Sequence, residues 1–275
     1  MKENTIILKH IEKTMRKRLS QAFFLLFLFI FSNTMAQAVN VSSFSYLQSL
    51  FPAGADIQLL NSIDYNGNIS TLTAVSTIRG STYSVIALQG RKNFNGFTIG
   101  AGGTANFTNN INLANFKAQR DILFANRLYG GAIYVSRQNS KINFIDAFAN
   151  LSFNMADYGA AIAVSSLAIA NISNSTLSFS NNSASNFGGA IYVNLSSTLS
   201  FTRTNLTFSN NSAQDRGGAV YIGSYSWLNF INSTSSFNSN RAGSGAVFYI
   251  ERSSMNINSS FLDFKTNKVT SIGQG

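Results

Sequence analysis

Short runs of alternating apolar and small polar residues fill most of the chain, and they end at Gly, Asn or Ser. A period of two is typical of β-strands that bury one face, whereas no long stretch has the helical period of 3.6. The exception is Val41–Phe51, which we expect to form a short helix that caps one end of the fold. Turn signals such as Asn66-Gly67 and Gly102-Gly103 separate the strands predicted before the regular part of the chain. These strands are Asp56–Leu60, Ile69–Val75, Tyr83–Leu88, Gly96–Ile99 and Ile111–Phe116.

One segment of the chain recurs almost intact. Leu177–Val193 reads LSFSNNSASNFGGAIYV and Leu206–Ile222 reads LTFSNNSAQDRGGAVYI, with eleven of seventeen positions identical. Aligned glycine motifs extend the series in steps of 29, 29, 29 and 27 residues. The motifs are Gly130-Gly131-Ala132, Gly159-Ala160-Ala161, Gly188-Gly189-Ala190, Gly217-Gly218-Ala219 and Ser244-Gly245-Ala246. A unit of this length cannot bury an apolar face alone, so its repetition predicts a solenoid of stacked units.

Equivalent positions of stacked units become columns, with rungs about 4.8 Å apart. Two aliphatic columns are expected to face the interior, because β-branched side chains suit a buried strand face. The first column holds Ile133, Ile162, Ile191, Val220 and Val247, and the second holds Val135, Val164, Val193, Ile222 and Tyr249.

A phenylalanine upstream of each glycine motif predicts an aromatic column. The series is Phe124, Phe153, Phe179, Phe208, Phe237 and Phe264. The last four are followed three positions later by Asn182, Asn211, Asn240 and Asn267. Stacked asparagines can bond to one another along the axis, and paired glycines permit positive φ where the chain turns. The sequence therefore predicts an all-β fold, a right-handed parallel β-helix with about one three-strand coil per 27–29 residues, its handedness following the crossover rule.

The first 38 residues have the three parts of a secretory signal peptide. The basic residues Arg16–Arg18 precede the apolar run Ala22–Phe31, which is too short to span a bilayer, since that takes about 20 residues. An A-x-A end follows, so we expect cleavage after Ala38, with Ala36 as the alternative. Translation from Met15 instead of Met1 would give a more ordinary signal. We therefore expect export through the inner membrane and no integral membrane span in the mature chain.

The pairing of Gly-Gly-Ala-Ile/Val with Phe-x-x-Asn resembles the repeat of the chlamydial-type polymorphic membrane proteins, which are autotransporter adhesins. The pattern is complete at Phe179–Asn182 with Gly188–Ile191, and again at Phe208–Asn211 with Gly217–Val220. Tyr129–Val135 matches only the glycine half. The resemblance covers roughly residues 120–275 and implies a surface passenger that mediates adhesion.

We divide the chain into three parts. Residues 1–38 form the signal peptide, 39–119 the N-terminal cap with degenerate coils, and 120–275 the regular coils. A member of the resembled family would carry a membrane barrel after the coils, yet the sequence stops at Gly275, about where the next glycine pair would begin. We therefore expect either a truncated product or fragment, or a protein released by another route.

The net charge of the chain does not alter the fold and function predicted above. Of the 20 basic residues behind the net charge of +10, six lie in the first 18 positions, and the rest are thinly spread. This distribution argues against a nucleic-acid partner. The absence of cysteine excludes disulfides and thiolate metal sites, and the single histidine, His10, lies in the signal.

β-Helices also carry carbohydrate-active enzymes, so the fold alone does not exclude catalysis. Such sites need grouped carboxylates. The acids after the signal are Asp56, Asp64, Asp121, Asp146, Asp157, Asp215, Glu251 and Asp263. Only Asp157 and Asp215 come close to sharing a turn, two coils and roughly 10 Å apart. We predict no catalytic, cofactor or metal site, and the alternative hypothesis is a pectate lyase-like or glycosidase-like enzyme with an unrecognised site.

An aromatic stripe alternates with the aliphatic columns and is therefore expected to face outward. It comprises Tyr134, Tyr192, Tyr221 and Phe248, with Ala163 interrupting. Exposed rings suit a sugar or a protein partner, whereas stacked rings can also simply stabilise neighbouring strands. We interpret the chain as an exported bacterial surface or secreted protein, a passenger-like adhesin or structural stalk without catalysis. Its expected location is the cell surface, the outer membrane or the extracellular space, and its partner a host or neighbouring-cell protein or glycan.

Overall fold

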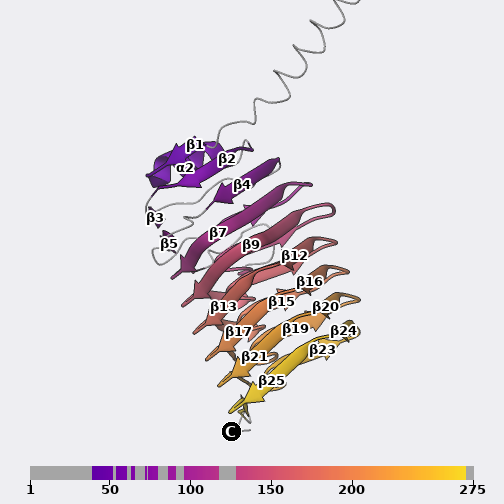
Figure 1. Cartoon of the computed structure of the whole chain (residues 1–275). Helices are drawn as coiled ribbons and strands as arrows, with labels where there is room; N and C mark the ends of the chain where they lie inside the picture. The colour runs from indigo at the N-terminus through magenta and orange to yellow at the C-terminus, as the bar shows by residue number, and fades with distance from the viewer. Residues whose placement is uncertain are drawn as a thin grey trace, which may run out of the picture. The chain divides into compact units, whose positions relative to one another are not determined.

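The structure is a computed structural model that describes residues 39–51, 54–60, 63–65, 72, 74–79, 86–90, 96–117 and 128–270. These residues form a β-solenoid of parallel strands with about six turns and almost no helix, which confirms the predicted fold class (Figure 1). The expected signal peptide with Ala36 and Ala38 lies outside the described residues. So do Phe124 and most of the expected strand Ile69–Val75.

Three parallel sheets run along the stack, with 15, 5 and 6 strands. The first, here called the large sheet, bends at a corner and contributes two strands to each regular coil. Its first arm comprises β1 (Val39–Val41), β2 (Asp56–Leu59), β4 (Val75–Arg79), β12 (Ile169–Ser173), β16 (Thr198–Thr202), β20 (Trp227–Ile231) and β24 (Ser254–Asn258). Its second arm comprises β3 (Ile63–Tyr65), β5 (Ile86–Gly90), β13 (Thr176–Ser180), β17 (Asn205–Ser209), β21 (Thr234–Asn238) and β25 (Phe261–Lys265). The long strands β7 (Thr104–Ala114) and β9 (Lys141–Ser152) run through both arms.

The two smaller sheets complete each coil. The second sheet comprises β10 (Met155–Tyr158), β14 (Ser183–Phe187), β18 (Ser212–Ala213), β22 (Arg241–Ala242) and β26 (Lys268–Val269). The third sheet comprises β6 (Phe97–Ile99), β8 (Ile133–Ser136), β11 (Ile162–Ser165), β15 (Ile191–Val193), β19 (Val220–Gly223) and β23 (Phe248–Glu251).

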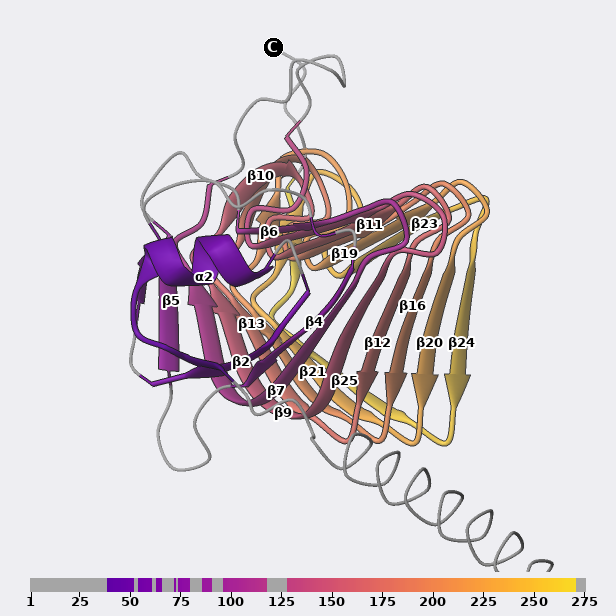
Figure 2. The ribbon, with the colours of Figure 1, turned by 90° about the horizontal axis from the view of Figure 1, so that it is seen from above.

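Successive coils follow a right-handed path. One coil leaves β11 in the third sheet, passes through β12 and β13 in the large sheet and β14 in the second, and returns to the third at β15. Seen from the N-terminal end, this path runs clockwise and recedes from the viewer (Figure 2). The sense is the one that the crossover rule predicts.

The interior columns follow the 29-residue spacing until the last coil. Ile191 pairs with Val220 and Val193 with Ile222, and all four side chains are fully buried. In the last coil the prediction is wrong. Phe248, not Val247, lies beside Val220, and Ile250, not Tyr249, lies beside Ile222. The shortening of this coil is divided between two turns, because Val220 is 28 positions from its partner whereas Trp227, which pairs with Ser254, is 27.

The phenylalanine column occupies another side of the interior. The rings of Phe179 and Phe208 stack at a centroid distance of 4.6 Å, and Phe208 and Phe237 at 4.8 Å, all fully buried. Phe264 continues the stack at 5.2 Å on the last, more exposed coil. The prediction that Phe153 belongs to this column is wrong. Phe153 lies in a turn and is 56% exposed, and Leu151 pairs with Phe179 in its place.

A ladder of buried asparagines follows the phenylalanine column at the next corner. Each Nδ2 donates 3.0 Å to the Oδ1 of the next asparagine, from Asn154 through Asn182, Asn211 and Asn240 to Asn267. The same Oδ1 also accepts the preceding asparagine's backbone N–H. The second Nδ2 hydrogen donates to a backbone carbonyl, as from Asn211 to Phe179 at 2.9 Å. Every amide group of the ladder interior is therefore paired, which buried polar atoms require.

Serine side chains also bond to the backbone of neighbouring coils at another corner. Ser226 Oγ accepts the backbone N–H of Ser197 at 3.2 Å, and Ser253 Oγ accepts that of Ser226 at 3.0 Å. Because these asparagine and serine side chains bond to the adjoining coil, they fix the turns of neighbouring coils to one another.

The two glycines of each pair are required for different physical reasons. Gly188 lies at φ +67°, a conformation that favours glycine. A Cβ on Gly189 would lie 2.1 Å from the carbonyl oxygen of Gly218 and 2.7 Å from the backbone nitrogen of Ser212. The first glycine therefore makes the turn, and the second lets the next coil approach.

The predicted N-terminal helix is present as α2 (Phe44–Leu50), beside β1 and β2 at the start of the stack (Figure 1). Leu47 and Phe51 are fully buried in the main core, and the Phe51 ring lies 4.9 Å from that of Phe97. Ser76 Oγ donates 2.8 Å to the Phe51 carbonyl. These contacts attach the helix end to the first coils.

Candidate functional site

The motif residues of the repeats are parts of the scaffold. The first glycines, Gly130, Gly188 and Gly217, all have positive φ. Gly245, which the alignment placed as a second glycine, also has positive φ and is the equivalent of Gly217, because Ser244 pairs with Arg216. The second glycines, Gly131, Gly189 and Gly218, face backbone atoms of the adjoining coil with no room for a Cβ. The phenylalanines and asparagines of the motif form the two interior columns described above. Because these residues make turns or pack in the interior, a binding surface must be formed by other side chains.

The aromatic stripe is not the exposed platform that the alternation predicts. Tyr192 and Tyr221 point out of the third sheet, yet each is only 4% exposed. Phe248 is not part of the stripe, because Tyr249 pairs with Tyr221. The covering rings come from the ends of the second sheet and the segments beside it. We name the combined set the outer aromatic layer: Tyr129, Tyr134, Tyr158, Phe187, Tyr192, Tyr221 and Tyr249.

Rings of the outer aromatic layer contact one another both along the axis and across the two columns. Tyr192 and Tyr221 stack along the axis at 5.3 Å with planes 11° apart. Phe187 lies over Tyr221 at 4.8 Å, and Tyr158 over Tyr192 at 5.2 Å. The layer is thus a second hydrophobic core outside the coil, because the chain folds back over the third sheet before entering it.

Arg216 is the equivalent of Phe187 in the next coil and lies where an aromatic ring would continue the cover over the third sheet. Its guanidinium lies 5.4 Å from the Phe187 ring and 4.9 Å from the Tyr249 ring, distances typical of cation–π contact. Arg216 also pairs with Glu251 at 3.1 Å, and the Tyr221 hydroxyl donates to the same carboxylate oxygen at 2.9 Å. This cluster was not predicted from the sequence, although Phe187 and Arg216 occupy equivalent repeat positions.

Burial changes the acidity of the two covered tyrosines. Desolvation raises the pKa of Tyr192 above its ordinary value, against the hydrogen bond that Asn194 donates to its hydroxyl. Desolvation raises the pKa of Tyr221 as well, and its hydrogen bond to Glu251 adds to the shift. Both hydroxyls therefore hold their protons, and neither is disposed to act as a base.

Among the described carboxylates, Asp157, Asp215 and Asp56 have separate partners, although Asp215 and Glu251 both approach Arg216. Asp157 accepts hydrogen bonds from Ser185 Oγ and from the Leu128 backbone, whereas Asp215 lies 3.8 Å from Arg216. Asp56 makes a two-pronged pair with Arg79 at 2.7 and 2.8 Å. Among the described residues, no group of three or more His, Cys, Asp or Glu side chains could hold a metal ion.

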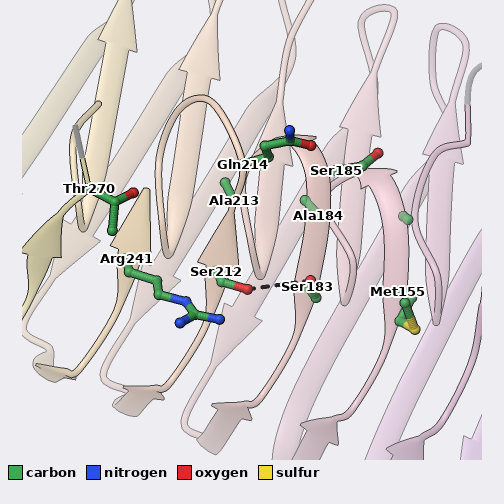
Figure 3. A pocket seen from close by; sticks show the side chains of 10 residues that line it. Met155, Ser183, Ala184, Ser185, Ser212, Ala213, Gln214, Arg241 and Thr270 are labelled. Carbon is green, nitrogen blue, oxygen red and sulfur yellow. Dashed lines mark hydrogen bonds between the residues drawn. The ribbon is translucent and has the colours of Figure 1, made fainter. Parts of the chain in front are cut away.

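A shallow groove runs over the second sheet and is the candidate binding site (Figure 3). One side is a row of in-register residues, and the other is a row from the strand ends with small alanines between them. The first row is Met155, Ser183, Ser212 and Arg241. The second row is Ser185, Gln214 and Thr270, with Ala184 and Ala213 on the floor. The groove has a volume of about 540 Å³.

The groove offers hydrogen-bonding groups in a repeating series. Ser212 Oγ donates to Ser183 Oγ at 3.3 Å, so the two hydroxyls form a short ladder along the axis. Arg241 is exposed at one end and lies in register with Lys268 on the next coil. The arrangement suits an extended ligand that bears oxygen acceptors. The sequence did not predict it, since serines scattered through a serine-rich chain give no signal.

Across the described part of the chain, we find no helix of the length and apolar character needed to cross a membrane.

Two segments of the chain match the family model of the Chlamydia polymorphic membrane protein repeat, at residues 176–194 and 205–223. Comparison with curated proteins found no match, and neither did comparison with solved structures. The first matched segment runs from β13 through β14 to β15, and the second from β17 through β18 to β19. Each therefore begins in the large sheet, crosses the asparagine corner and the second sheet, and ends beyond the glycine turn. The two matched segments are the ones whose motifs predicted the resemblance to this repeat.

Proposed function

We propose that this protein is an exported, surface-located adhesin of the passenger type, without catalysis, which binds a protein or glycan on a host or neighbouring cell. The matched repeat belongs to polymorphic membrane proteins and supports an outer-membrane or surface location. A fold of repeated coils also suits a long display surface, since solenoids use extended faces for binding.

The observation that carries the proposal is where the two matched repeats differ. Their longest run of unlike residues is Ser185–Phe187 in one copy and Gln214–Arg216 in the other. Ser185 and Gln214 both line the groove over the second sheet, beside Ser183 and Ser212, which are identical in the two copies. Other identical positions hold the interior columns, the outer aromatic layer and the glycine turn. The scaffold is thus kept from coil to coil, and one of the three changes, Ser185 to Gln214, falls on the groove, where a partner would contact it.

Attachment of cells tests the proposal. The full chain is displayed on a non-adherent bacterium, and attachment to cultured epithelial cells is counted. The double variant Gln214→Ser/Arg241→Ser gives two coils the serines of their upstream neighbours, Ser185 and Ser212, and so leaves the scaffold unchanged. Asn205→Thr, which copies Thr176 on the outer face of the large sheet, is the matched control.

The adhesin account predicts attachment by the parent and the control, and loss of most attachment by the groove variant. Attachment of the parent and the groove variant to the same extent would remove the groove from the account. No attachment by the parent at all would leave the structural stalk as the better description.

A further inference from the structure

We propose that Tyr225, Trp227 and Arg252 form a second binding site, for a pyranose sugar that carries an acidic group. The site lies at the corner between the third sheet and the first arm of the large sheet, on residues outside the groove over the second sheet. It deepens the proposed adhesin function by naming a ligand class, and it rests on that function only for its biological use.

Two large rings stand exposed at this corner. Tyr225 is 69% exposed and Trp227 52%, although elsewhere the tyrosines of the outer aromatic layer are mostly covered. The equivalent residues one coil upstream are Ser196 and Thr198, and Ser254 pairs with Trp227 one coil downstream. The pair of exposed rings is therefore absent from the equivalent positions of the coil before it and the coil after it.

The turn beneath Tyr225 is the same as in the two preceding coils, so only the rings are particular to this coil. Ser224 and Tyr225 have φ of +51° and +62°, a left-handed turn that favours Gly or Asn. Leu167 and Leu195 occupy the same kind of turn in the two preceding coils, so the corner as a whole accepts this strain.

The two rings border a hollow between adjacent coils. Tyr225, Ser226 and Trp227 line it from one coil, and Arg252, Ser253 and Ser254 from the next. Its volume is about 420 Å³, within the range of small-ligand sites. Ser226 is almost fully buried and bonded to Ser253, so the frame that holds the rings is already ordered.

The chemistry of the lining favours a sugar with a negative charge. A pyranose presents C–H groups on its faces and hydroxyls at its rim. Its C–H groups can pack against the flat faces of the Tyr and Trp rings. In the part of the chain that the structure describes, no hydrogen-bond or ion-pair partner faces the guanidinium of Arg252. Its planar fork matches a carboxylate or sulfate in two-point contact. A lipid surface would need no hollow, and an extended peptide would need free strand edges, which both flanking strands have already used.

The chain offers a built-in probe, because Trp227 is its single tryptophan. The full chain is titrated with the methyl glycosides of glucuronic acid and N-acetylneuraminic acid, and with methyl glucoside and methyl galactoside as neutral counterparts. We expect the acidic glycosides to shift the tryptophan emission in a saturable way. Neutral glycosides should bind about tenfold more weakly, as expected for one charge-assisted hydrogen-bonded pair.

Two variants copy neighbouring coils and so keep the fold. Arg252→Ser reproduces Ser224 and should lower the affinity for the acidic glycosides to that for the neutral ones. Tyr225→Ser/Trp227→Thr reproduces Ser196 and Thr198 and should abolish binding in saturation-transfer NMR, where no tryptophan is needed. The control Leu195→Ser changes an exposed apolar residue of another coil and should bind like the parent.

The proposal is overturned if none of the four glycosides changes the emission, or if the double variant binds as tightly as the parent. A blue shift caused by anionic phospholipid vesicles, with no response to sugars, would assign the corner to a lipid surface instead. Because this readout uses purified protein, it can succeed while cell attachment fails, and the reverse.

Discussion

The ring of Phe187 lies flat against the ring of Tyr221 in the next coil, with centroids 4.8 Å apart and planes 16° apart. Phe187 ends a strand of the second sheet and Tyr221 is central in a strand of the third, so the contact joins two sheets across the outside of a coil. It explains why a tyrosine that points away from the interior is nevertheless buried. The solenoid therefore has two cores, an aliphatic and phenylalanine interior and the outer aromatic layer.

The first prediction concerns alkaline pH. A tyrosine has an ordinary pKa of about 10, and burial raises the pKa of Tyr192 in the folded state. The unfolded chain therefore releases this proton at a lower pH than the folded one, so its stabilising contribution is complete below about pH 10 and is lost as the pH rises. Urea unfolding midpoints should fall above that pH, and fall less in Tyr192→Phe. Tyr225→Phe, at an exposed position, serves as the control, and an equal alkaline loss in both variants would contradict the assignment.

The second prediction tests close approach at the glycine turn. An alanine at Gly189 would place Cβ 2.1 Å from a backbone oxygen of the next coil, which no side-chain rotation relieves. We expect Gly189→Ala to lower the free energy of unfolding by about 3 kcal/mol or more. Gly102→Ala, at positive φ with open space around it, should cost about 1–2 kcal/mol from backbone strain alone. Equal midpoints in urea for the two variants would show that the coils are not in contact at Gly189.

The third prediction compares the buried asparagine ladder with an asparagine pair on the outer face of the large sheet, Asn171 and Asn143. Asn211→Ala removes the acceptor of two Asn182 donors inside the fold, at about 1–3 kcal/mol for each group left unsatisfied. Asn171 donates to Asn143 at 3.1 Å on the outer face, where water can replace the bond, so Asn171→Ala should cost less than about 0.5 kcal/mol. Chemical denaturation of both variants gives the comparison. A loss at Asn171 as large as that at Asn211 would contradict the burial of the inner ladder.

The fourth prediction uses the natural variation of the phenylalanine column. Leu151 already occupies this column beside Phe179, so leucine fits its cross-section. Phe208→Leu should cost less than about 1.5 kcal/mol, whereas Phe208→Ala should cost about 3–5 kcal/mol through the cavity it leaves. Calorimetric unfolding distinguishes the two. A mild effect of the alanine variant would mean that the stack is not tightly packed.

Sequence alone predicted the columns because a solenoid turns equal spacing into vertical neighbours. Ile191 over Val220 and Phe179 over Phe208 follow directly from the 29-residue interval. The last coil was misaligned because its shortening is divided between two turns. The alignment placed all of it before Val247, whereas part falls between Glu251 and Ser254.

The candidate surfaces were harder to predict from sequence. Strand alternation placed Tyr192 and Tyr221 on the outer face, but it carries no information on which segment folds over that face. Phe187 and Arg216 cover it only because the glycine turn brings the second sheet back against the third. The exposed pair Tyr225 and Trp227 gave no periodic signal, since a single coil departs from its neighbours there.

The stacking of the two repeats as adjoining rungs is tested most directly by cross-linking, since the chain has no cysteine of its own. Ser178 pairs with Thr207, and Thr207 with Ser236, on the outer face of the large sheet. We predict that Ser178→Cys/Thr207→Cys is joined rapidly by a thiol reagent about one rung, or 4.8 Å, in length. The pair Ser178→Cys/Ser236→Cys, two rungs apart, should not react. Cross-linking of the second pair but not the first would contradict the solenoid.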